Sequence, residues 1–203
     1  MTHTLGRPDF DLIAGWVEPG HRVLDLGCGD GALLKLLITT RNVQGWGVDI
    51  EDANVLAAIR NGINVIQSNL EKGLADFADD AFDHVVLSRT LQTVRHTEHI
   101  LREMLRVGRE AVVSFPNFAY WQNLRSVLDG RMPVSEDLPY QWYDSPNVRF
   151  FTLLDFEALC GQMGLTIVER RVLDEAGEIV LADSPRDLNF LGSLAVYRLT
   201  RPR

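Results

Sequence analysis

The sequence has few cysteines, no long apolar run and no apolar leader segment. Its two cysteines, Cys28 and Cys160, lie far apart and outside any C-x-x-C pair, which argues against a disulfide framework or a thiolate metal site. No stretch approaches the roughly 18 apolar residues that span a bilayer, and residues 1–10 contain no apolar core of a secretory signal. We therefore expect a cytoplasmic protein with no membrane contact.

Basic residues are also scarce, and they form no run. The 203 residues include 20 Lys+Arg against 28 Asp+Glu, a formal charge of −8. A net acidic surface repels phosphate backbones and anionic headgroups, so we expect neither a nucleic-acid nor a membrane-surface role. The charged fraction of 24% and the hydrophobic fraction of 46% are ordinary for a globular chain, and the length predicts a single domain over residues 1–203.

Short β-branched segments alternate with longer amphipathic ones, which is typical of βα units around a parallel sheet. The strands expected from this pattern are 21–26, 44–49, 63–67, 82–88 and 110–115. The helices expected are 9–17, 31–39, 53–60 and 97–107. Gly108 is expected to end the last of these helices as a C-terminal stop.

The periodicity stops after the fifth strand and resumes near residue 153. Residues 115–151 hold nine of the 17 aromatic residues and four of the eight prolines, and we interpret them as an insertion packed by its own rings. A helix at 153–163 and strands at 165–172 and 193–200 follow, with an irregular segment at 182–189. The sequence therefore predicts an α/β fold with a Rossmann-like seven-stranded sheet, mostly parallel, whose last strand is antiparallel.

The sharpest motif is VLDLGCGDG at residues 23–31, where a strand gives way to a helix. Its three glycines allow a tight turn and close approach of a ligand to the main chain. The glycine spacing alone also fits a dinucleotide, but Asp25 and Asp30 flank the position of the pyrophosphate and would repel it. A cationic ligand with an ammonium group is favoured. In the alternative interpretation, Asp30 only favours the helix start and Asp25 caps backbone amides.

Two further strand ends carry residues suited to a nucleoside. Asp49 ends the second strand, 20 residues after Gly29, and a carboxylate there can accept hydrogen bonds from a ribose diol. The third strand ends in residues 67–70, which offer a side-chain amide and an apolar face to a purine, with Ile50 opposite. We expect these residues to lie at one edge of the sheet, where open α/β sheets bind ligands.

The order of these motifs resembles the class I S-adenosylmethionine-dependent methyltransferases. Over nearly its whole length, the chain more narrowly resembles the MetW methionine-biosynthesis family. That closer likeness lies in VLDLGCGDG at 23–31, LSRTLQ at 87–92, SFPNF at 114–118, GRMP at 130–133 and LPYQWYD at 138–144.

The resemblance implies S-adenosylmethionine or S-adenosylhomocysteine as the cofactor. The expected cofactor-binding residues are Asp25, Gly27, Cys28, Gly29, Asp49, Ile50, Asn69, Leu70 and Ser88. One position departs from the wider pattern, because Asn69 stands where an aspartate is usual. An amide oxygen can still accept a hydrogen bond from adenine, but a weaker one than a carboxylate accepts.

For function, the family resemblance implies a partner that binds and activates homoserine O-acyltransferase (MetX). The alternative is a methyltransferase acting on a small molecule. The sequence offers no convincing general base, since Arg89, Thr90, Gln92 and Asn117 are the polar residues expected on the methyl side. The FPNF segment at 115–118 follows the fifth strand rather than the fourth, so we assign it no catalytic role. A homo-oligomer is left open.

Three other features have competing interpretations. Cys28 is interpreted as a packing residue rather than a nucleophile, and the HTEH segment at 96–99 as an exposed helix start rather than a metal site. The insertion is a lid over an acceptor pocket, a protein-binding face or an internal aromatic cluster. The side chains that suggest these roles are Tyr120, Trp121, Arg125, Arg131, Tyr140, Trp142, Tyr143 and Arg149.

Overall fold

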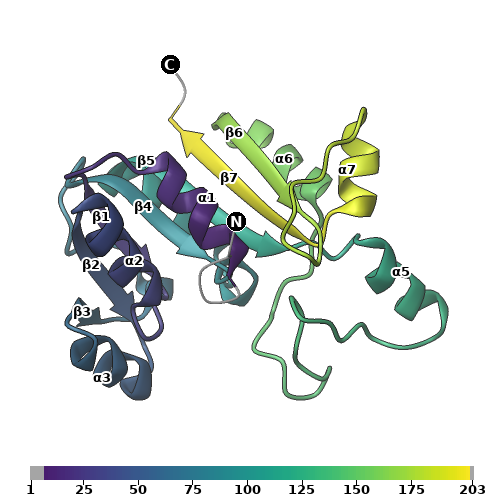
Figure 1. Ribbon diagram of the computed structural model, residues 1–203, viewed down its shortest axis with the longest axis horizontal. Helices are drawn as coiled ribbons and strands as arrows, with labels where there is room; N and C mark the ends of the chain where they lie inside the picture. Colours follow the sequence, from purple (N-terminus) through teal and green to yellow (C-terminus); the bar gives the residue numbers. More distant parts are fainter. Residues whose placement is uncertain (1–6, 202–203) are drawn as a thin grey trace.

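A computed structural model describes residues 7–201 and contains one seven-stranded sheet (Figure 1). The strand order is β3-β2-β1-β4-β5-β7-β6, and only β7 runs antiparallel to its neighbours. The predicted α/β fold class and the antiparallel last strand are therefore confirmed. The strands are β1 (Arg22–Leu26), β2 (Gln44–Asp49), β3 (Asn64–Gln67), β4 (Phe82–Ser88), β5 (Gly108–Pro116), β6 (Thr166–Leu173) and β7 (Leu194–Thr200).

Helices flank the sheet on both faces. None of those in residues 7–201 is long and apolar enough to cross a bilayer. The α-helices are α1 (Pro8–Trp16), α2 (Ala32–Arg41), α3 (Asp52–Arg60), α4 (Thr97–Val107), α5 (Trp121–Leu128), α6 (Leu153–Gln162) and α7 (Pro185–Leu191). Two short 3-10 helices, η2 (Leu70–Lys72) and η3 (Leu91–Thr93), follow β3 and β4.

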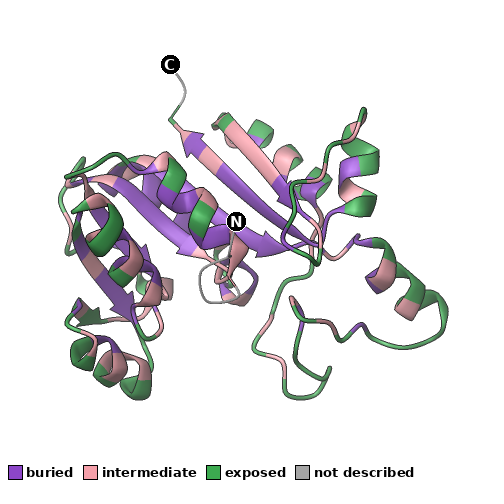
Figure 2. Ribbon diagram, in the orientation of Figure 1, coloured by how far each residue is buried: buried purple, intermediate pink, exposed green. Residues whose placement is uncertain are grey.

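The sheet separates two hydrophobic cores because successive strand residues face opposite sides. In β4, Val85 and Leu87 join the core beneath α4 and α6, whereas Val86 joins the core beneath α1 and α2. Figure 2 shows the central strands almost wholly buried and the segment containing α5 mostly exposed. Burial on both faces explains why these strands read as continuous apolar runs.

The position of β1 within the sheet defines where a ligand can bind. Its neighbours are β2 on one side and β4 on the other, so the connections leaving β1 and β3 run in opposite directions across the sheet. Such a reversal opens a crevice at the carboxyl ends of the strands. The glycine motif, Asp49 and Ser88 lie at the carboxyl ends of β1, β2 and β4 respectively.

Three local predictions were wrong. The helix α5 lies within the insertion, and α7 occupies much of the segment expected to be irregular. The rings of the insertion do not all pack on one another, since Trp142 is 75% and Tyr143 71% exposed. Gly108 does end α4, as predicted, but with an extended backbone rather than a left-handed one. Its missing side chain leaves room for Val85, whose Cγ2 would lie 2.6 Å from a Cβ there.

Candidate functional site

The turn after β1 is built from left-handed glycines packed against neighbouring segments. Gly27 has φ of +68°, and a Cβ there would meet the Thr90 side chain at 2.7 Å. The backbone N–H groups of Gly27 and Cys28 both donate to the Val48 carbonyl, at 2.7 and 3.1 Å. The turn is therefore fixed to the ends of both β2 and β4, and a side chain at Gly27 would separate it from β4.

A cavity of about 350 Å³ lies beside this turn. Its wall contains five of the nine predicted cofactor residues: Asp25, Gly27, Cys28, Gly29 and Ser88. The other lining residues are Arg7, Phe10, Asp30, Ala32 and Leu33, which the sequence analysis did not assign to the cofactor.

Asp25 contributes a buried carboxyl to the cavity wall. It is 2% exposed, and its side chain makes no hydrogen bond with any residue from 7 to 201. Burial, with the nearby charges of Asp49 and Asp9, raises the pKa of Asp25 to about 7, against the opposing charge of Arg7. A carboxyl without a protein donor is suited to a ligand that brings a positive charge. The alternative that Asp25 caps backbone amides is not supported by this geometry.

Asp30, by contrast, acts locally. Its Oδ1 accepts a hydrogen bond of 3.1 Å from the Ala32 N–H at the start of α2, as the alternative interpretation of this residue proposed. Its side chain also lies in the cavity wall.

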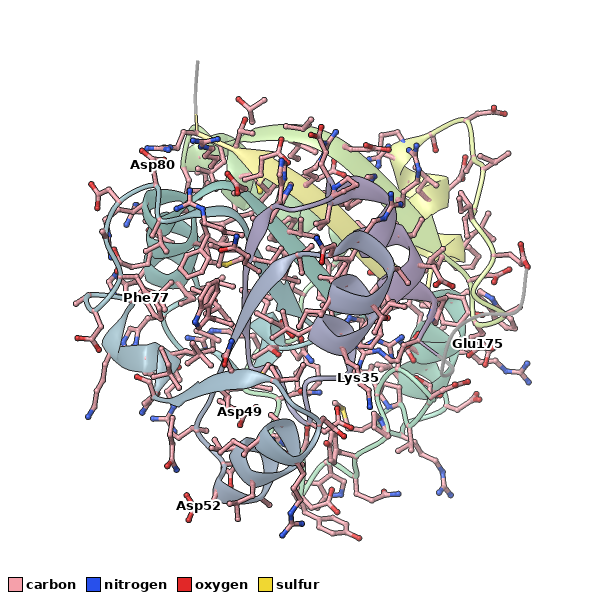
Figure 3. All side chains as sticks on the ribbon, turned by 60° about the vertical axis from the view of Figure 1, so that its left-hand side comes forward. Lys35, Asp49, Asp52, Phe77, Asp80 and Glu175 are labelled. Carbon is pink, nitrogen blue, oxygen red and sulfur yellow. The ribbon has the colours of Figure 1, made fainter. Side chains whose placement is uncertain are left out.

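Asp49 is connected to the glycine turn rather than to the cavity itself. It is 6% exposed, and its Oδ2 accepts a hydrogen bond of 2.8 Å from the Gly29 N–H. Its Oδ1 accepts from the Glu51 N–H and from Asn54 Nδ2, at 3.0 and 3.2 Å. Figure 3 shows Asp49 and Asp52 near one another at one end of the sheet, with Asp80 at the opposite end. The carboxylate thus positions the turn next to the expected ribose.

The three remaining predicted residues lie next to Asp49, outside the cavity. Ile50 is 52% exposed at the end of β2, available as one face for a ring. The Asn69 amide oxygen accepts from the Glu71 N–H at 2.9 Å and caps η2, and Leu70 packs partly against the core beneath α4. The Ser68 N–H donates to the Asp49 carbonyl, which keeps the ends of β2 and β3 adjacent.

An arginine from the start of α1 completes the cavity wall, and a buried aspartate behind it holds it in place. Arg7 donates to both carboxylate oxygens of Asp9, at 3.0 and 2.9 Å, and to Ser88 Oγ at 2.7 Å. Asp9 is fully buried and also accepts from the hydroxyls of Ser88 and Ser114. Burial alone would raise the pKa of Asp9, but Arg7, Arg89 and Ser88 outweigh it and hold that pKa below its ordinary value. Asp9 is therefore a permanent carboxylate that fixes Arg7.

Arg89 and Gln92, two of the polar residues expected on the methyl side, follow the end of β4. Arg89 has a left-handed backbone, φ +49°, and pairs with Asp137 of the insertion at 3.1 Å. Its other terminal nitrogen lies 3.7 Å from Asp9. Within residues 7–201, Arg89 Nε and the Gln92 side-chain oxygen are buried without a hydrogen-bond partner. No side chain here supplies a base, since arginine stays protonated and an amide does not titrate.

Cys28 and His96, the candidates for a nucleophile and for part of a metal site, both take structural roles. Burial, with the charges of Asp25 and Asp49, raises the pKa of Cys28 to about 12, so its thiol stays protonated. Its sulfur packs against Gly47, where a Cβ would lie 2.5 Å away. The exposed His96 pairs with Glu71 at 2.6 Å. Across residues 7–201, no three His, Cys, Asp or Glu side chains lie close enough to hold a metal ion.

The fold matches solved methyltransferase structures over almost its full length. A S-adenosylmethionine-dependent methyltransferase from Archaeoglobus fulgidus superposes with a TM-score of 0.71 and 16% identity, covering 97% of this chain and 93% of that one. The structure of a complex between the Haloferax volcanii Trm112 methyltransferase activator and a putative methyltransferase matches with a TM-score of 0.69 and 17% identity, covering 98% and 91%. The chain therefore has the class I, Rossmann-like methyltransferase fold.

The family is defined more narrowly by sequence. Residues 7–199 match the family model described as methionine biosynthesis protein MetW. The bifunctional methionine biosynthesis protein MetXA/MetW of Rhodopirellula baltica is 40% identical over 193 residues, 89% of this chain. The chain spans only 31% of the length of that relative. It belongs to the MetW methionine-biosynthesis family.

Proposed function

We propose that this chain binds S-adenosylmethionine or S-adenosylhomocysteine and acts as an activating partner of homoserine O-acyltransferase (MetX). One observation carries the partner assignment. The MetW-like part of the Rhodopirellula relative belongs to a bifunctional protein named MetXA/MetW. Joining two modules in one chain holds them at high effective concentration, which serves modules that work in contact.

The cavity supports the cofactor part of the proposal. Its wall combines a tight glycine turn with the unbonded carboxyl of Asp25, and Asp49 braces the turn from β2. Space beside the glycine backbone, the Asp49 carboxylate as an acceptor for a ribose and a site for a cation together suit an aminoacyl nucleoside with a sulfonium centre. A dinucleotide pyrophosphate would face Asp25 and Asp30, which repel it.

A docking surface for the partner is available on the insertion. The surface consists of exposed apolar side chains on α5 and the loop after it: Leu124, Val127, Leu128, Met132, Tyr140, Trp142 and Tyr143. Figure 1 shows this segment projecting away from the sheet, and Figure 2 shows it mostly exposed. Exposed apolar patches with Trp and Tyr are characteristic of protein interfaces. We assign the acyltransferase to this surface.

Cofactor binding would then give the pair a regulatory use. S-adenosylmethionine is an end product of the methionine pathway. If its binding alters the contact with the acyltransferase, the two proteins form a feedback sensor, in which cofactor and partner affinities change each other reciprocally. The acyltransferase rate would then depend on the S-adenosylmethionine concentration only in the presence of this chain.

Two exposed leucines allow a matched test of the docking surface. Leu128 on α5 is 86% exposed, and Leu181, which precedes α7, is 88% exposed. The acyltransferase is mixed with wild-type chain, Leu128→Ala combined with Trp142→Ala, or Leu181→Ala, and each mixture is run on a sizing column. We expect co-elution with the wild type and Leu181→Ala and its loss with the double variant. If the wild type does not co-elute with the acyltransferase, the partner assignment is contradicted. If the double variant still binds, the acyltransferase does not dock on the insertion surface.

A methyltransferase acting on a small molecule is the second candidate. The observation that favours it is the extent of the cavity, which reaches Ser88 at the end of β4. Methyl transfer needs mainly an in-line approach to the sulfonium, so orientation at such a position can suffice without a base. Incubation with methyl-labelled S-adenosylmethionine and cell extract tests this function. A labelled small molecule whose formation is lost in Asp49→Ala would establish it, and no labelled product would count against it.

A further inference from the structure

The start of α4 borders a cavity with a basic wall, although the chain is acidic overall. This basic cavity has a volume of about 500 Å³ and shares no lining residue with the cavity beside the glycine turn. The sequence contains no basic run, but the fold gathers arginines from the turn before α4, from α4 and from the segment ahead of α6. The wall contains three arginines and two histidines against one carboxylate: Arg95, Arg102, Arg149, His96, His99 and Glu98.

Two of these arginines carry charges that no carboxylate in the described part of the chain neutralises. The Arg95 side chain forms no hydrogen bond or ion pair with any described residue. Arg149 donates only to backbone carbonyls, those of Arg95 at 3.0 Å and Val148 at 3.4 Å, which hold its guanidinium in place. Arg102 pairs with Glu98 at 3.1 Å, but both side chains are mostly exposed, and such a pair contributes little. The cavity therefore has a surplus of positive charge.

An apolar cavity of about 180 Å³ adjoins the basic cavity. Its wall includes Phe150, which is 48% exposed, and Phe156, which is 1% exposed. The carboxylate of Asp155 also lies in this wall, but it accepts hydrogen bonds from the N–H and the hydroxyl of Thr152 at 3.1 and 2.8 Å in the cap of α6. Three residues line both cavities: Thr97, Arg149 and Leu159.

The two cavities together favour a compact ligand with a strongly anionic group at one end and an apolar group at the other. A phosphate monoester carries a charge of about −1.5 to −2 at pH 7 and offers three acceptor oxygens, which suit several planar guanidinium groups. A carboxylate offers a single charge and two oxygens. Charges more than about 8 Å away are largely screened at physiological ionic strength, so a compact anion meets mainly the basic wall. An extended acidic protein surface would also face the rest of this acidic chain.

We infer that Arg95, Arg102 and Arg149 bind the phosphate group of a phosphate ester, and that its apolar group enters the cavity lined by Phe150 and Phe156. A cavity of about 150 Å³ holds a benzene ring, so the apolar group is a ring or a short chain. The basic cavity and the cavity at the glycine turn are separate sites, and this inference does not depend on the proposed cofactor.

NMR titration of the isotope-labelled chain with phenyl phosphate, butyl phosphate and inorganic phosphate tests the inference. We expect saturable shifts of the amides of residues 95–102 and 149–159, and no shifts at residues 23–31. The better ester should bind about tenfold more tightly than inorganic phosphate, because only an ester buries an apolar group. Tighter binding of phenyl phosphate indicates a ring and tighter binding of butyl phosphate a chain, and either result supports the inference.

Arg95→Gln is the sharpest variant, because the Arg95 side chain has no structural contact to lose. We expect the Kd for the better ester to rise at least about fivefold, with an unchanged urea midpoint of unfolding. Arg60→Gln is the matched control, since it removes the same charge from an exposed arginine in the last turn of α3. Its Kd should stay within about twofold of the wild type. Phe150→Ala should weaken binding of the esters but not of inorganic phosphate.

Three results would overturn the inference. The first is the absence of saturable shifts at residues 95–102 and 149–159 with either ester. The second is the same Kd in Arg95→Gln as in the wild type, or the same Kd for inorganic phosphate as for both esters. The third is tighter binding of an oligoglutamate peptide than of either ester at the same amides, because the basic cavity would then be a docking site for an acidic protein segment.

Discussion

Arg89 and Asp137 form an ion pair of 3.1 Å that joins the end of β4 to the insertion. Both side chains are largely buried, at 19% and 13% exposure. The same guanidinium lies 3.7 Å from Asp9, which fixes Arg7 in the cavity wall. A single arginine thus lies between the carboxylate behind the cavity at the glycine turn and the segment that we assign to the partner.

Removing the Asp137 charge should loosen the insertion without affecting the sheet. In Asp137→Asn the pair with Arg89 loses its ionic component, and we expect amide hydrogen exchange over residues 131–150 to accelerate at least about threefold. Hydrogen exchange followed by mass spectrometry measures the exchange rate of this segment directly. Asp144→Asn is the matched control, because Asp144 is an exposed aspartate in the same loop. Equal exchange in the two variants would contradict a role for the pair.

Asp49 should affect cofactor binding more than its neighbour Asp52. Asp49→Ala removes the acceptor for the Gly29 N–H and the carboxylate next to the expected ribose. We expect the Kd for S-adenosylhomocysteine to rise by about tenfold to hundredfold, the cost of losing charge-assisted hydrogen bonds. Asp52 is exposed at the start of α3, and Asp52→Ala should change the Kd less than about threefold. Calorimetric titration compares them, and a similar loss in both variants would count against the ribose assignment.

Cofactor affinity should rise with pH below neutrality. The pKa of Asp25 is about 7 in the free chain, so its carboxyl is mostly protonated at pH 5 and half-ionised near pH 7. Only the ionised form pairs with an ammonium group. We expect the affinity for S-adenosylhomocysteine to increase at least about tenfold from pH 5 to pH 7. In Asp25→Asn the affinity should be weaker and independent of pH over this range. A pH-independent affinity in the wild type would exclude Asp25 as the ammonium partner.

His84 should make the folded chain less stable in mild acid. Burial and the nearby charges of His21 and Arg198 lower the pKa of His84 to about 4 from 6.5, against the opposing effect of Asp83. Above pH 6.5 the neutral ring is present in both folded and unfolded chains. As the pH falls from 6.5 to about 4, the unfolded chain takes up a proton that the folded chain does not, at a cost of up to about 3 kcal/mol.

Urea unfolding at pH 7 and pH 5 gives the fall in the free energy of unfolding between the two pH values, which is then compared between variants. His84→Gln removes the titrating group, so its free energy of unfolding should fall less than that of the wild type between the two pH values. His99→Gln, at an exposed histidine on α4, should follow the wild type. If His84→Gln and the wild type lose the same free energy, the buried ring does not titrate as described.

The sequence predicted the central strands well because they contain consecutive apolar residues that are buried on both faces of the sheet. β2 and β4 begin and end where the periodicity placed them, at Gln44–Asp49 and Phe82–Ser88. α7 was missed because it has only seven residues and begins with a proline. α5 was missed although Trp121, Leu124 and Leu128 recur at helical spacing. It has only eight residues, and it lies in a segment rich in aromatic residues and prolines.

The candidate site was predictable where its residues are adjacent in sequence. The glycine turn and Asp25 both line the cavity, and their contact with a cofactor stays a prediction. Arg7 was missed because its place in the cavity wall depends on a distant contact, the hydrogen bond to Ser88, which lies 81 residues away. The only local signal was an Arg-Pro-Asp segment before a helix, which resembles an ordinary helix start.

The acyltransferase rate tests the central claim most directly. Homoserine O-acyltransferase is assayed for acyl transfer alone, with this chain, and with the Leu128→Ala, Trp142→Ala double variant. We expect the initial rate to rise several-fold with the wild-type chain and to remain at the basal level with the double variant. The same rate with and without the wild-type chain, at concentrations well above those of the enzyme, would contradict the proposed function.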